Sequence, residues 1–170
     1  MRMTEPAARA RAYDLMGLAL NALGVRDDSG MRSVGGPCVE DADVNKQRHG
    51  YVSVGYGLEV QYTSFATASE AANKVLKAWV DAGHIATQGW TGGTSAAPEP
   101  ALFARSAPDG YLMSVSVNNH MTLEFGVSSP CFPGQETAAP TAPRSSASAA
   151  PATQPPRADG GSHRIRDVLG

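Results

Sequence analysis

The stretch "GYLMSVSVNNHMTLEFGVS" (Gly110 to Ser128) carries the clearest strand pattern of the sequence. Apolar residues alternate with small or polar ones on both sides of the turn-forming "NNH", which predicts two antiparallel strands joined by a tight turn. A slip of one residue in the pairing would expose the whole apolar set, so the register is expected to be firmly fixed. The residues predicted to face inward are Tyr111, Met113, Val115, Val117, Met121, Leu123, Phe125 and Val127.

An amphipathic helix and a strand precede this hairpin. Residues Glu5 to Leu23 carry apolar side chains at helical spacing, with Thr4 as the expected N-cap and Gly24 as the expected C-terminal glycine. The later run "YVSVGYGLEVQY", which starts at Tyr51, alternates as a strand with one buried face. Two glycines lie on its other face, a pattern typical of a bulge or of the close approach of another backbone.

A second helix follows this strand. Thr67 and Glu70 have the spacing of a capping box, and Gly83 is expected to end the helix. Trp79 lies in the middle of the apolar stripe of this helix. We therefore expect its indole to be buried against the sheet.

These elements predict an α+β protein. The expected order is α-β-α-β-β-β-β, with residues 25–49 as an irregular connection and "HIATQGW", "ALFARS" and the hairpin as the last four strands. Single apolar faces on helices and strands predict a two-layer sandwich, in which an antiparallel sheet of about five strands carries two helices on one face. Residues 1–134 form this single domain, and residues 135–170, rich in Ala, Pro and Ser, are predicted to be a disordered tail.

Composition and charge exclude some classes of protein. The chain has 170 residues and a formal net charge of −2, which argues against a nucleic-acid partner. It has no apolar run of the length that a membrane-spanning helix needs. We recognise no export signal either, because Asp14 and Asn21 interrupt the apolar N-terminal stretch and "RDDSG" follows it.

Catalytic and metal-binding patterns are not evident. Phosphate-binding loops and serine-hydrolase motifs are missing from the sequence. Glu59 and Glu124 fall on outward strand positions, where solvated side chains are expected, and Trp90 is either a rim of the core or a ligand contact. Four histidines lack the spacing of metal ligands: His49, His84, His120 and His163. We therefore predict no cofactor, no metal site and no catalytic residues.

The two cysteines allow two interpretations. Cys38 lies in the irregular connection and Cys131 just after the last strand, where a bridge would tie loose segments to the sheet. The alternative is a Cys131 nucleophile paired with His120, but "SSPCFPG" supplies no charge to activate a thiolate. We favour a Cys38–Cys131 disulfide, which in turn indicates an oxidising compartment outside the cytosol.

Several segments together resemble small exported lipoproteins of actinobacteria. These are "GPC", "VSVGYGLEV", "VLKAWVDAGHIATQGW" and "DGYLMSVSVNNHMTLEFGVSSPC", and the resemblance covers roughly residues 4–133. It implies an envelope-facing domain with a Cys38–Cys131 bridge, in a family of mostly unknown function. The present sequence differs in lacking a signal and a lipid-anchored cysteine.

Three functions follow from these observations. The first is a non-catalytic exported domain of the cell envelope, acting as a binding or structural module, with association at a membrane surface only through an anchor that this sequence does not contain. The second is a carrier of a small apolar ligand or lipid, and the third is a Cys131-dependent enzyme. A cytoplasmic location remains the alternative to the extracytoplasmic one. The residues considered as lining for a carrier are Trp79, Trp90, Met113 and Met121.

Overall fold

The computed structural model describes residues 2–40 and 43–134. The predicted tail, residues 135–170, lies outside the described residues. Two helices and eight strands occur in the described part, in the order α1 (Glu5–Leu23), β1 (Arg32–Glu40), β2 (Asp43–Gln61), α2 (Phe65–Asp81), β3 (Ile85–Ala86), β4 (Trp90–Gly93), β5 (Pro98–Arg105), β6 (Leu112–Val117), β7 (Thr122–Ser128) and β8 (Phe132–Pro133).

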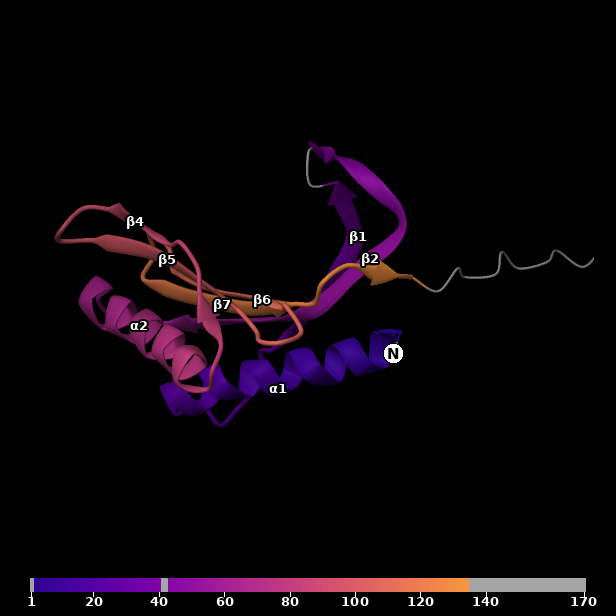
Figure 1. The fold of residues 1–170 in the computed structure, drawn as a ribbon. Helices are drawn as coiled ribbons and strands as arrows, with labels where there is room; N and C mark the ends of the chain where they lie inside the picture. Colours follow the sequence, from indigo (N-terminus) through magenta and orange to yellow (C-terminus); the bar gives the residue numbers. More distant parts are fainter. Residues whose placement is uncertain (1, 41–42, 135–170) are drawn as a thin grey trace, which may run out of the picture. The chain divides into compact units, whose positions relative to one another are not determined.

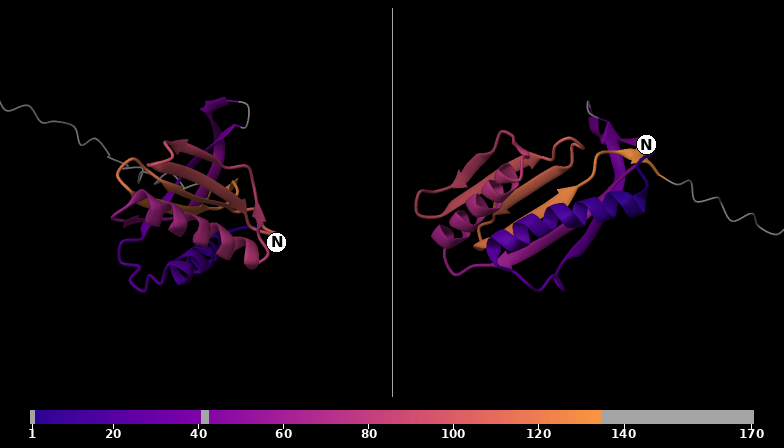
Figure 2. Two further views of the ribbon diagram at one scale, coloured as in Figure 1. Left: turned by 90° about the vertical axis from the view of Figure 1, so that its left-hand side faces the viewer. Right: turned by 60° about the horizontal axis from the view of Figure 1, so that its bottom comes forward.

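The strands form one antiparallel sheet, in the order β1-β2-β7-β6-β5-β3. The short strand β4 pairs with residues 98–101 of β5, along the same edge of β5 that β3 occupies at residues 104–105. Similarly, β8 pairs with residues 51–52 of β2, along the same edge of β2 that β7 occupies at residues 55–61. Both helices lie on one face of this sheet, whereas the β1–β2 hairpin rises on the side away from them (Figure 1; Figure 2). The predicted α+β class and the placement of two helices on one face are confirmed.

The predicted strand count and element order are wrong. Within the described residues the sheet has eight strands in place of about five, because β1 is an extra strand, the predicted strand "HIATQGW" is divided into β3 and β4, and β8 follows β7. Residues 25–49, predicted as an irregular connection, contain β1 and the start of β2. β1 contains Gly35, Gly36 and Pro37, so it shows no alternation, and its hydrogen bonds to β2 hold it extended. β2 itself begins at Asp43, eight residues before the alternating run that predicted it.

The ends of the two helices are capped differently. Thr4 occupies the N-cap position of α1, as predicted, but its side chain makes no capping hydrogen bond. Gly24 adopts the left-handed conformation after α1, with a φ of 65°, as predicted. α2 begins two residues before the predicted capping box, because the Ser64 hydroxyl accepts the Thr67 backbone N–H at 3.2 Å and is the true N-cap. Thr67 therefore lies inside the first turn of α2.

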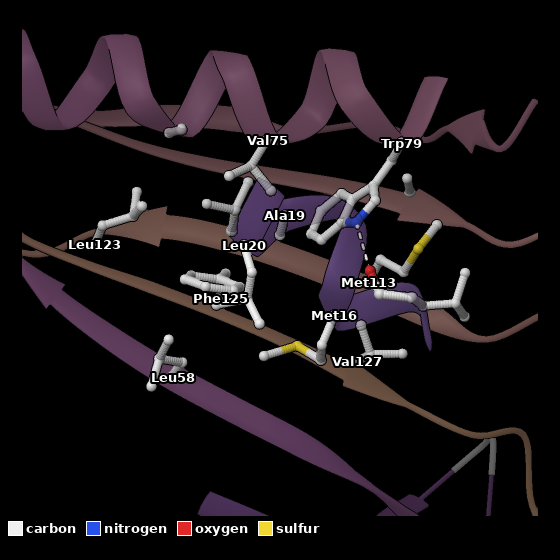
Figure 3. Packing of buried hydrophobic residues seen from close by; sticks show 14 of the residues in the cluster. Met16, Ala19, Leu20, Leu58, Val75, Trp79, Met113, Leu123, Phe125 and Val127 are labelled. Atoms are coloured by element: carbon white, nitrogen blue, oxygen red, sulfur yellow. Dashed lines mark hydrogen bonds between the residues drawn. The ribbon is translucent and has the colours of Figure 1, made fainter. Parts of the chain in front are cut away.

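The core lies between the helices and the sheet. Trp79 on α2 is fully buried, and its indole N–H donates to the Leu15 backbone carbonyl of α1 at 3.3 Å (Figure 3). Met113 and Phe125, from β6 and β7, face it from the sheet. The hydrogen bond satisfies the one polar atom of the indole, so the ring can be buried without an unpaired donor. The expected burial of Trp79 is confirmed.

Candidate functional site

Cys38 and Cys131 form a disulfide, with a Cα–Cα distance of 6.1 Å. Their neighbours Pro37 and Phe132 pair with the same residue, Val52, from opposite sides of β2. The bridge therefore crosses over β2 and fastens the edge strand β1 to the segment after β7. It also leaves no free thiol in this chain of two cysteines, so a Cys131–His120 nucleophile pair is not formed.

A polar cluster lies at the β5–β6 turn, where Ser, His and Asp side chains gather. The Ser106 hydroxyl donates to Asp109, and Arg11 of α1 donates to the same carboxylate at 2.7 Å. His84 accepts the Ala107 backbone N–H through Nδ1 at 3.3 Å and makes no hydrogen bond with the Ser106 hydroxyl, which bonds to Asp109 and Tyr111. The geometry joins the turn to α1 and contains no nucleophile–base pair.

Electrostatics agree with a structural role for this cluster. Burial acts to raise the pKa of Asp109, but the hydrogen bonds from Arg11 and Ser106 outweigh it and lower that pKa below its usual value. Burial, with the nearby Arg11 cation, lowers the pKa of His84. The lowered pKa of Asp109 favours the ionised carboxylate that its ion pair with Arg11 requires, and the lowered pKa of His84 favours the neutral imidazole.

The four residues considered as carrier lining do not come together. Trp79 and Met113 are fully buried in the core between helices and sheet. Trp90 is 63% exposed on the opposite face of the sheet. Met121 lies in the β6–β7 turn with a φ of 59°, where its predicted inward strand position is replaced by a left-handed turn conformation.

A cavity of about 540 Å³ lies elsewhere, between the start of α1 and the strands β2 and β8. Its apolar wall includes Met3, Val52 and Phe132, and its polar wall includes Arg2 and Glu5. None of the four predicted lining residues contributes to it.

The sheet face away from the helices, called here the outer face, is the most distinctive surface of the described chain. Pairing partners in an antiparallel sheet point to the same side, so the register assigns its residues directly. One row across the strands, the Trp90–Glu59 row, consists of Trp90, Ala101, Ser116, Glu124 and Glu59. The next row consists of Phe103, Ser114, Gly126, Gly57 and Arg32, and a third of Ile85, Arg105, Leu112, Ser128, Gly55 and Val34.

Small residues form the middle of the outer face, and the reasons for them differ. A Cβ at Gly55 would lie 1.8 Å from the Val127 carbonyl oxygen, so the fold itself requires glycine there. A Cβ at Gly57 would meet nothing closer than 3.8 Å, so packing within the described chain does not require this glycine. Glycine within a strand weakens it, and its presence without an internal reason is typical of a surface that another molecule approaches closely.

Large apolar side chains gather at one border of the outer face. Trp90 packs on Phe103, with ring centroids 5.2 Å apart, and Ile85 and Leu112 are 62% and 40% exposed nearby. Glu99 lies on the same face, half-buried, and makes no hydrogen bond or ion pair within the described residues. Of these border residues, only Trp90 stands out in the sequence, because alternation within one strand does not tell which residues of neighbouring strands lie beside it.

The described residues contain no group of three or more His, Cys, Asp and Glu side chains placed to hold a metal ion. Among the described helices, neither combines the length and apolar character needed to cross a membrane. Comparison of the chain with protein-family models, with curated proteins and with solved structures finds no match.

Proposed function

We propose that this chain is a non-catalytic interaction module that acts outside the cytosol, in association with the cell envelope, and binds through the outer face of its sheet. The observation that carries this proposal is the outer face itself, where exposed Trp90 stands beside a floor of small residues that internal packing only partly explains. Soluble domains normally place large polar side chains on an exposed sheet face. A face with an aromatic border and a flat centre suits contact with another molecule.

The disulfide supports the proposed location. Cys38 and Cys131 are bonded, and such bonds persist in oxidising compartments and are rare in the cytosol. The resemblance to actinobacterial exported lipoproteins points the same way. Alkylation of intact cells with a maleimide reagent tests it, since the pair should react only after reduction with a thiol. Two thiols that react without reduction would place the protein in the cytosol.

Binding through the outer face is tested by sedimentation of the disulfide-bonded full chain with actinobacterial cell-envelope fragments. Most of the Trp90→Ser variant should stay in the supernatant, because the substitution removes the largest exposed side chain of the outer face. Val80→Ser is the matched control, since Val80 is 43% exposed but lies on α2, on the helix side. Equal sedimentation of wild type and Trp90→Ser would overturn the proposal.

The carrier function is a second candidate, supported by the cavity beside Met3, Val52 and Phe132, whose volume of about 540 Å³ suits a small ligand. Displacement of a fluorescent fatty-acid probe tests it. Phe132→Ser should weaken probe binding and Trp90→Ser should not, because only Phe132 lines the cavity.

A further inference from the structure

We propose that the outer face binds a basic, extended segment of a partner protein, which crosses the strands along the Trp90–Glu59 row. This inference rests on the proposed function and names its ligand. One cationic side chain of the segment stacks on Trp90 and pairs with Glu99, and a second pairs with Glu124.

The first cation position combines an aromatic plane with an unpaired carboxylate. Trp90 is 63% exposed, while Phe103 packs against it and fixes its orientation. Glu99 lies on β5 two residues before Ala101, the pairing partner of Trp90, so Trp90 and Glu99 are diagonal neighbours on one face. A Lys or Arg side chain can lie over the indole and reach a carboxylate at that spacing.

Glycines opposite Glu99 keep this position open. Gly92 and Gly93 pair with Glu99 and Pro98 across the β4–β5 ladder. The fold itself requires glycine at Gly93, which has a φ of 76° and where a Cβ would lie 2.1 Å from the Ala97 carbonyl oxygen. A Cβ at Gly92 would meet nothing closer than 3.6 Å and would lie 3.9 Å from the Glu99 Cβ, so a larger side chain at Gly92 would pack beside Glu99 and restrict access to its carboxylate.

The second cation position lies further along the same row. Ala101 and Ser116 form a low floor between Trp90 and Glu124. Glu124 accepts a hydrogen bond from the Asn118 side-chain amide at 3.0 Å, which leaves its negative charge uncompensated. Glu59, the next residue of the row, is paired with Arg32. Two negative charges are therefore uncompensated along this path. One is Glu124 within the row, and the other is Glu99, which lies beside Trp90 at the start of the row.

The distance between the two positions sets the spacing of the segment. Trp90 on β4 and Glu124 on β7 are three strand intervals apart, which is about 14 Å at roughly 4.8 Å per interval. An extended chain advances about 3.4 Å per residue, so residues i and i+4 span this distance and point to the same side. The geometry therefore favours a segment with the pattern Arg-x-x-x-Arg or Lys-x-x-x-Lys.

The probe for this inference is the peptide Arg-Ser-Gly-Ser-Arg, with both termini blocked, titrated into the disulfide-bonded full chain. Binding can be followed by the fluorescence of Trp90, since Trp79 is the one other tryptophan and is buried, and confirmed by calorimetry. We expect Glu99→Gln and Glu124→Gln each to weaken binding at least 5-fold, and Glu59→Gln to change it less than 2-fold. A peptide with adjacent arginines should bind at least 3-fold more weakly.

The controls separate this inference from the proposed function. Replacement of both arginines by citrulline should abolish binding, and equal affinity of the citrulline peptide would overturn the basic segment. N-acetylchitotetraose serves as an uncharged glycan probe, and its binding with full retention in Glu99→Gln and Glu124→Gln would also overturn it. If the peptides fail to bind while Trp90→Ser still loses envelope sedimentation, the basic segment is wrong and the binding role of the outer face stands. If Trp90→Ser sediments as wild type does, both are wrong.

Discussion

The two faces of the sheet differ in what their side chains touch, although the same strands build both. On β6 and β7 the helix face presents Met113, Val115 and Phe125, all buried, whereas the adjacent positions on the outer face are Ser114, Ser116 and Gly126. Successive residues of a strand point to opposite faces, so alternate positions of each strand are selected for packing against the helices and for the outer surface. The helix face supplies the apolar burial that stabilises the domain.

This difference explains which residues of the outer face are informative. The fold requires glycine at Gly55, where β7 passes too close for any side chain, but not at Gly57. Residues that internal packing does not require, such as Gly57 and exposed Trp90, are the ones for which an external contact is the simplest physical reason. Substitutions on each face test this difference.

The largest effect is expected at the disulfide, because the far end of the β1–β2 hairpin rises away from the helices and no described residue of β1 belongs to the hydrophobic core clusters (Figure 1). Cys38 and Cys131 are 93 residues apart, and closing a loop of that length contributes about 4 to 5 kcal/mol in the chain-entropy account. The double Cys→Ser variant should lose a large part of this in urea unfolding. Wild type in reductant should match the variant, and a loss under about 1 kcal/mol would show that packing alone holds the hairpin.

The next effect compares the two tryptophans, one on each side of the sheet. Trp79→Ala should cost about 3 to 5 kcal/mol, because removal of the fully buried indole leaves a cavity and loses its hydrogen bond to the Leu15 carbonyl. Trp90→Ala should cost about 1 kcal/mol or less, because Trp90 is 63% exposed. Thermal or urea unfolding measures both. Similar losses for the two variants would contradict the assignment of Trp90 to a surface role.

The helix layer could be predicted from the sequence because its signals are local. The apolar period of Glu5 to Leu23, with Thr4 before it and Gly24 after it, coincides with α1. The alternation around "NNH" likewise predicted β6 and β7, except that Met121 lies in the turn and not in β7. Local patterns of period 3.6 or 2 suffice where one face of the element is buried.

The β1 strand and the outer face could not be predicted in this way, because they depend on pairing between distant segments. β1 has glycines and a proline in place of alternation, and its extended form follows from its bonds to β2. The candidate site combines Trp90, Glu99 and Glu124 from three strands, and only the register shows that they are neighbours. Glu124 alone indicates no more than a solvated carboxylate.

A moderate effect is expected at Asp109, whose ion pair with Arg11 joins the β5–β6 turn to the helix layer. Its pKa in the folded protein lies below the unfolded value of 3.8, so ionised Asp109 stabilises the fold above that pH, and the contribution is lost as the pH falls through the folded pKa. Asp109→Asn should cost about 1 to 2 kcal/mol at pH 7 and progressively less as the pH falls below 3.8. Urea unfolding at pH 7 and at pH values below 3.8 measures this.

The matched control for Asp109 is Glu70→Gln, since Glu70 pairs with Lys74 at 3.2 Å on the exposed side of α2. Exposed pairs of this kind contribute little, so this variant should unfold almost as wild type does at all of these pH values. A pH-independent loss in Asp109→Asn would show that hydrogen-bond geometry, and not the charge, matters at the turn.

The smallest effect is expected at Gly57, where the informative result is whether a substitution raises or lowers the stability of the fold. Gly57 has no positive φ and has room for a Cβ, so Gly57→Ala should leave the fold intact and raise its stability by about 0.5 to 1 kcal/mol, because alanine has less backbone freedom to lose. Gly55→Ala should instead be strongly destabilising, because its Cβ would overlap the Val127 carbonyl. Unfolding curves of the two variants measure the contrast. A loss of stability in Gly57→Ala would mean that the fold itself requires this glycine, and the flat centre of the outer face would then need no external partner to explain it.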